Sequence, residues 1–141
     1  MKIYYLLFLL LISFTSFSQA PGEDPNLKFD SFDLQIIELA DSILSSPAVW
    51  NKQDDRECYN DVENNNYSLF CALLKASQDV LGEYEHRRAC MQIVRFTLEK
   101  YAEDRVKQHR MMDWNNHPDT SFEEVKKVLR ESAEEVGKHL K

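Results

Sequence analysis

Three cysteines and four histidines are the residues whose types could support metal binding or thiol chemistry. His86 and Cys90 are four positions apart, the spacing at which two side chains share one face of a helix. They would supply half of a tetrahedral zinc site, and the remaining ligands would have to come from Cys58 and a carboxylate. A cysteine nucleophile needs a base and oxyanion donors nearby, and the sequence contains no recognisable motif that provides them. A metal- or thiol-dependent enzyme is therefore the alternative hypothesis, with no catalytic residue, metal ligand or cofactor assigned.

A polar segment in the middle of the chain is rich in oxygen donors, which are the ligands that Ca²⁺ prefers. Its donor residues are Asp54, Asp55, Glu57, Asp61, Glu63 and Asn64. The segment lacks the ligand order and the central glycine of an EF-hand loop. Because a run of charges is usually a solvated surface, a calcium-stabilised domain is only the third hypothesis.

The expected helix geometry also restricts which cysteines can form a disulfide. If residues 69–81 and 84–108 form antiparallel helices that turn at Gly82, Cys71 and Cys90 are offset by about 6 Å along the helix axes. Adding an interhelical distance of about 9 Å separates their Cα atoms by more than a disulfide tolerates. A bridge, if one forms, should therefore use Cys58, which can reach either partner. The candidate pair is Cys58 with Cys71, and three free thiols in the core are the alternative.

The first twenty residues have the three regions of a secretory signal peptide. Lys2 supplies the positive start, residues 4–12 form an apolar run, and residues 13–20 are small and mildly polar. Cleavage after Ser18 and cleavage after Ala20 both satisfy the rule of small residues at the cleavage site. The pattern predicts an exported protein, periplasmic or secreted. The apolar run is shorter than the about 20 residues of a spanning helix, so no membrane anchor is expected after cleavage.

The net charge of −7 restricts the partners of the chain. An acidic chain without a basic block gains nothing from the release of phosphate counterions, which argues against nucleic-acid binding. An anionic membrane surface is an equally poor partner. The expected partner is an unknown protein or surface component.

Four amphipathic segments must position these residues. Apolar side chains recur at the three- and four-residue spacing of a helix in residues 31–45, 69–81, 84–108 and 121–139. Residues 21–30 form a flexible lead-in, and a long polar loop over residues 48–66 joins the first two helices. The sequence therefore predicts an all-α fold, a single four-helix bundle-like domain over residues 31–141.

Residues 111–125 separate the last two predicted helices. Trp114 is a large apolar side chain among turn-forming residues, so its ring is expected to fold back onto the core. Pro118 disfavours helix at the residue before it. Thr120 or Ser121 should cap the final helix, with a glutamate three residues later closing a capping box.

A binding site is expected where the Trp114 segment meets the loop that carries Trp50. Trp50, Trp114, Asn115 and His117 are the candidate binding residues, although a tryptophan of this kind is more often a core anchor. Since no catalytic group is assembled in the sequence, the preferred hypothesis is a non-catalytic, exported binding module.

The order of several short motifs resembles an uncharacterised bacterial family, the domain of unknown function family 6197. The motifs are Trp50 after the first helix, Phe70-Cys71-Ala72-Leu73 opening the second, Trp114-Asn115-Asn116 with Pro118 and Thr120, and Glu124-Val125 with Val128-Leu129 in the last helix. The resemblance covers about residues 34–133. It implies a small helical fold and no catalytic residue, and it directs attention to Cys71, Trp114 and Asn115 as a shared face.

Overall fold

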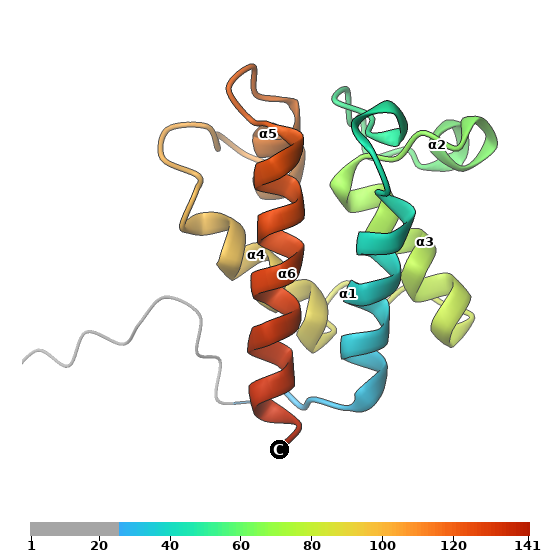
Figure 1. The fold of residues 1–141 in the computed structure, drawn as a ribbon, viewed down its shortest axis with the longest axis vertical. Coiled ribbons are helices and arrows are strands. Elements are labelled where there is room, and N and C mark those ends of the chain that lie inside the picture. Colours follow the sequence, from blue (N-terminus) through green and yellow to red (C-terminus); the bar gives the residue numbers. More distant parts are fainter. Residues whose placement is uncertain (1–25) are drawn as a thin grey trace, which may run out of the picture.

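The structure, a computed structural model, describes residues 26–141, and their secondary structure is helical apart from one isolated bridge. The elements, shown in Figure 1, are α1 (Ser31–Ile43), η1 (Pro47–Val49), α2 (Tyr59–Asn64), α3 (Leu69–Leu81), α4 (Ala89–Glu99), α5 (Arg110–Asn116) and α6 (Phe122–His139). The bridge joins Trp50 to Tyr67. The all-α class predicted from the sequence is confirmed.

The predicted signal peptide, both cleavage positions and the first half of the predicted lead-in lie outside the described residues. Within the part of the chain that the structure describes, no helix is both long enough and apolar enough to cross a membrane.

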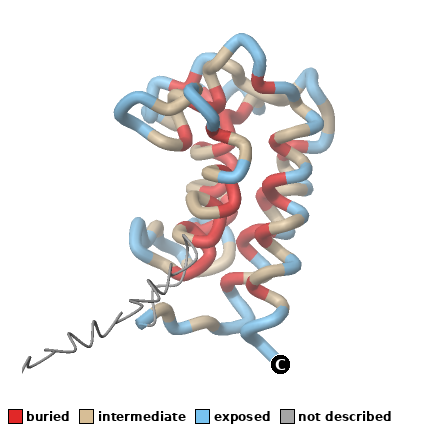
Figure 2. Tube along the Cα trace, turned by 90° about the vertical axis from the view of Figure 1, so that its left-hand side faces the viewer, coloured by how far each residue is buried: buried red, intermediate tan, exposed pale blue. Residues whose placement is uncertain are grey.

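The core lies between the four longer helices. Helix α1 packs against α3 and α6, and α4 packs against α6. Figure 2 shows buried positions concentrated on the facing sides of these helices. The largest fully buried side chains include Trp114, Ile36, Ile37, Leu44, Leu69, Leu73, Met91, Leu98 and Leu129. Burial of these apolar side chains is the dominant favourable contribution to folding.

Local capping interactions explain the helix ends that the sequence predicts well. The Ser68 hydroxyl accepts a hydrogen bond from the Cys71 amide at 3.1 Å and starts α3, and Gly82, with a φ of 80°, ends it. Helix α6 begins after Ser121, whose side chain forms a reciprocal capping box with Glu124. These caps satisfy amide groups that have no partner inside the helix.

The third predicted helix, residues 84–108, is wrong at both ends, because α4 spans only Ala89–Glu99. The buried carboxylate of Asp33, on α1, accepts a hydrogen bond from the Cys90 amide at 3.1 Å and so caps α4 from another helix. Beyond the other end, the Trp114 indole donates to the Tyr101 carbonyl at 3.2 Å. Apolar periodicity continues through both regions, but tertiary contacts determine where the helix begins and ends.

The predicted irregular loop over residues 48–66 contains two short helical elements, η1 and α2. Helix α2 ends at Asn65, which has a left-handed conformation with a φ of 50°. A second unpredicted helix, α5, carries Trp114, which the sequence analysis placed in a turn. The indole is nevertheless fully buried, as expected.

A disulfide joins Cys58 to Cys71, with their Cα atoms 5.2 Å apart. It is the pair named from the sequence, and it ties the residue before α2 to the first turn of α3. Cys90 is a free, buried thiol. The middle of the polar loop is thus covalently attached to the core through α3.

Candidate functional site

The structure brings the Trp50 loop and the Trp114 segment together through Asn115. The Asn115 Oδ1 atom accepts hydrogen bonds from the Trp50 indole at 2.9 Å and from the Leu69 amide at 3.1 Å. Its Nδ2 atom donates to the Asn51 carbonyl at 2.9 Å. Since Asn115 is fully buried, these bonds satisfy polar groups that would otherwise be costly to bury. Asn115 therefore fixes the loop against α5 and α3.

Trp114 and Asn115 present no surface to a ligand because both are fully buried. Trp50 and His117 are partly exposed, and His117 lies 3.8 Å from Asp119, its neighbour in the turn. The binding role predicted for these four residues stays a prediction. In the structure, three of them join the loop to α5 or seal the core.

The next residue along α5, Asn116, holds the loop segment that contains Asp54. Its Oδ1 atom accepts from the Asp54 amide at 2.7 Å, and its Nδ2 atom donates to the Asp54 carbonyl at 2.8 Å. The Asp54 carboxylate in turn accepts a hydrogen bond from the Arg56 amide at 2.7 Å. This chain of bonds places Arg56, whose φ of 68° is unusual for a residue with a side chain, at the edge of a surface pocket.

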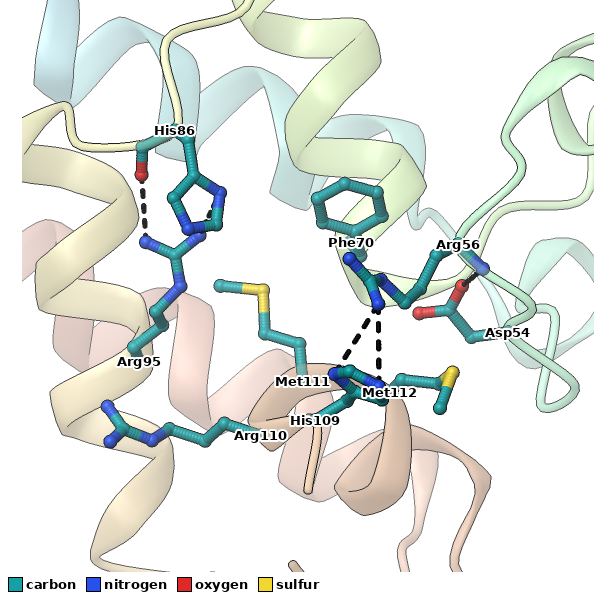
Figure 3. A pocket seen from close by; sticks show the side chains of 9 residues that line it. All are labelled: Asp54, Arg56, Phe70, His86, Arg95, His109, Arg110, Met111 and Met112. Atoms are coloured by element: carbon teal, nitrogen blue, oxygen red, sulfur yellow. Dashed lines mark hydrogen bonds between the residues drawn. The ribbon is translucent and has the colours of Figure 1, made fainter.

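That pocket has a volume of about 130 Å³ and is built from the loop, α3, the segment before α4, α4 and α5. Its lining residues are Asp54, Arg56, Phe70, His86, Arg95, His109, Arg110, Met111 and Met112. In Figure 3, His86 and Arg95 lie on one side and Arg56 and Asp54 on the other, with Met111 between them. The pocket lining thus contains three arginines, two histidines and one aspartate, although the chain as a whole has a net charge of −7.

Two of these arginines lack the usual partner of a guanidinium. Among the described residues, neither Arg56 nor Arg95 forms an ion pair with a carboxylate, whereas Arg110 pairs with Glu99 at 2.6 Å. Arg56 instead contacts the ring of His109 at 3.4 Å. Arg95 donates to the His86 carbonyl at 2.9 Å and lies 3.1 Å from its Nδ1 atom. Both guanidinium groups keep donors available for a planar anion.

The histidine beside Arg95 reports the positive potential of the pocket. The charge of Arg95 lowers the pKa of His86 below its usual value, with further lowering from desolvation, Arg87 and Arg56. The Tyr84 hydroxyl lies 3.1 Å from the same Nδ1 atom. A neutral imidazole is therefore favoured in the empty pocket, and a bound anion would favour the charged form.

Asp54 is the one acidic lining residue, and it is largely buried. The residue is 5% exposed, and burial raises the pKa of its carboxyl group. One of its oxygens is occupied by the Arg56 amide. Asp54 therefore orients Arg56 and places one acidic group on the Arg56 side of the pocket.

The geometry does not favour the thiol and metal hypotheses. Cys58 and Cys71 are bonded to each other, and burial raises the pKa of the Cys90 thiol, which disfavours a thiolate there. His86 precedes α4, so it does not share a helical turn with Cys90. In residues 26–141, no group of three or more His, Cys, Asp or Glu side chains is placed to hold a metal ion.

In the sequence, His86 is a candidate zinc ligand and Asp54 a candidate calcium ligand, but no motif gives a role to the arginines. The pocket residues come from four separate parts of the sequence: residues 54–56, Phe70, residues 86–95 and residues 109–112. One weak signal was available. The dipeptide His-Arg occurs at residues 86–87 and at residues 109–110, near the two ends of the predicted third helix.

Comparison with known protein families matches residues 32–135 to the family described as "Family of unknown function (DUF6197)". The chain belongs to this family. The matched region contains every residue that lines the pocket, and it confirms the resemblance found in the sequence motifs. No curated protein and no solved structure matches the chain.

The electrostatic coupling between Arg95 and His86 predicts a pH dependence. In the folded protein His86 should titrate below its value in the unfolded chain, so the unfolded chain takes up its proton first as pH falls. The contribution of His86 to stability should therefore decrease as pH falls through the usual histidine range and level off below the folded pKa. Nuclear magnetic resonance titration of the imidazole checks this order.

A matched pair of variants distinguishes the effect of a charge inside the pocket on the pKa of His86 from the effect of net charge alone. Arg95→Gln should raise the pKa of His86, whereas Arg130→Gln, an exposed change on α6 outside the pocket, should leave it unchanged. An equal response to both variants would show that no local field acts on His86.

Proposed function

We propose that this chain is an exported, non-catalytic binding module and that the basic pocket is its binding site. The observation that carries the proposal is the pair Arg56 and Arg95, two guanidinium groups on opposite sides of one pocket without carboxylate partners among the described residues. Unpaired arginines that converge on a cavity favour an anionic ligand group.

The partner is then a protein or surface component that presents an anionic group. The rest of the chain remains acidic, which would repel an anionic polymer or membrane but not a single small anion entering the pocket. The signal-like first twenty residues support export. A disulfide is also typical of proteins in oxidising compartments.

Calorimetric titration of the purified protein with inorganic phosphate tests the proposal. Binding should saturate at one site and weaken as ionic strength rises, because the pocket is open to solvent. Removal of one charged hydrogen-bond donor from a partly exposed site should weaken binding by about tenfold, so Arg56→Gln and Arg95→Gln should each have this effect.

The matched control is Arg130→Gln, which makes the same change in net charge on α6. It should bind phosphate as the unmodified protein does. The proposal would be wrong if phosphate and acetate both failed to bind at low ionic strength, or if the control variant lost as much affinity as the two pocket variants.

A further inference from the structure

The pocket is not lined by basic groups alone. Phe70, Met111 and Met112 contribute apolar surface to the lining, and Met111 lies between the two arginines. The Phe70 ring is held by an edge-to-face contact with Tyr84, with ring centroids 5.8 Å apart. Met111 is 6% exposed and packs against the core below the pocket. These three side chains form the apolar floor of the pocket, and the contacts of Phe70 and Met111 hold it in place. An inorganic anion alone would leave this floor uncovered.

The size of the pocket restricts its occupant. A volume of about 130 Å³ is close to the roughly 150 Å³ of a cavity that accommodates benzene. This space admits one anionic group with a body of a few carbon atoms. It is too small to enclose a nucleotide or a sugar chain.

The charges of the lining restrict the occupant further. Arg110 is already paired with Glu99 at 2.6 Å, so Arg56 and Arg95 are the two lining guanidinium groups that have no carboxylate partner among residues 26–141. The Asp54 carboxylate lies on the same side as Arg56. A second negative charge on the ligand would approach this carboxylate, so a single negative charge fits the pocket better.

We infer that the pocket binds a small carboxylate with a flat or branched apolar body, the carboxylate lying between Arg56 and Arg95 and the body on Phe70 and Met111. This inference rests on the proposed function and names its ligand class. A guanidinium matches the planar carboxylate with two parallel hydrogen bonds. The sulfur and methyl groups of Met111 and Met112 adapt readily to the shape of an apolar group.

The test compares four probes by calorimetry on the purified protein: benzoate, acetate, inorganic phosphate and benzyl alcohol. Burial of part of the benzene ring should make benzoate bind about tenfold more tightly than acetate. Benzoate should also bind more tightly than phosphate, and benzyl alcohol, which lacks the charge, should not bind measurably.

Variants of the apolar floor separate its contribution from that of the arginines. Phe70→Ala should reduce the preference for benzoate over acetate from about tenfold to about twofold or less. If Phe70→Ala does not fold, Met112→Ala, at a partly exposed position, should reduce the same preference. Arg130→Gln again serves as the control for net charge.

The outcomes distinguish this inference from the proposed function. If acetate or phosphate binds as tightly as benzoate and depends on Arg56 and Arg95, the apolar inference is wrong and the anion site remains. If benzyl alcohol binds as tightly as benzoate, or no anion binds, both are wrong.

Discussion

Replacement of Trp114 with alanine is expected to destabilise the protein by about 3 to 5 kcal/mol, the usual cost of emptying a buried aromatic site. The side chain is fully buried, and its indole donates to the Tyr101 carbonyl at 3.2 Å. The variant would create a cavity and leave that carbonyl without its partner. Urea denaturation followed by circular dichroism measures the change in free energy of unfolding.

Two further variants show whether the effect belongs to the buried ring. Trp114→Phe keeps most of the apolar area but loses the hydrogen bond, so its loss should be smaller, about 1 to 2 kcal/mol. Tyr59→Ala removes an aromatic ring that is 76% exposed and should change stability by less than about 0.5 kcal/mol. A loss below about 1 kcal/mol for Trp114→Ala would mean that the indole is not part of the core.

Removal of the disulfide is the second change with a large expected effect. Cys58 and Cys71 are 13 residues apart, and a crosslink that closes a loop of this size typically contributes about 3 kcal/mol by restricting the unfolded chain. The double variant Cys58→Ala, Cys71→Ala should lose about this amount in urea denaturation. It should also bind phosphate more weakly, because the loop that carries Arg56 would be less restrained.

A reductant provides the internal control for this prediction. Reducing agent should lower the stability of the unmodified protein to about that of the double variant and should leave the double variant unchanged. Equal stability of the unmodified protein with and without reductant would contradict a contribution from the Cys58–Cys71 bond.

The helices that depend on local interactions could be predicted from the sequence. Helix α3 follows an apolar stripe between a serine cap and a glycine, and its predicted bounds agree with the structure. The capping box of α6 was predicted from Ser121 and a following glutamate for the same reason. Both signals involve residues within one helical turn of each other.

The ends of α4 and the presence of α5 depend on residues distant in the sequence. Asp33 caps the first turn of α4 from α1, and Trp114 contacts the carbonyl beyond its last turn. The Asp113 carboxylate accepts hydrogen bonds from three successive amides, those of residues 107 to 109, and these bonds lower its pKa. Apolar periodicity contains no information about such contacts, so it extended the helix too far.

The pocket, too, depends on contacts between residues that are distant in the sequence. Arg56, Arg95 and the histidines beside them come from separate segments, and each residue alone is an ordinary surface charge in the sequence. Asn115, a predicted binding residue, and its neighbour Asn116 hold the loop that brings Arg56 to the pocket. Their neighbourhood was therefore informative even though Asn115 itself is buried.

The most direct test of the anion site measures which residues respond when an anion binds. Three of the four methionines lie in the described part of the chain: Met111 and Met112 line the pocket, and Met91 is buried in the core outside it. Magnetic resonance of the methionine methyl groups, recorded during a phosphate titration at constant ionic strength, reports on both locations. The Met111 and Met112 signals should shift with one shared saturation curve while the Met91 signal stays in place. No saturable shift, or an equal shift at Met91, would contradict an anion site in this pocket.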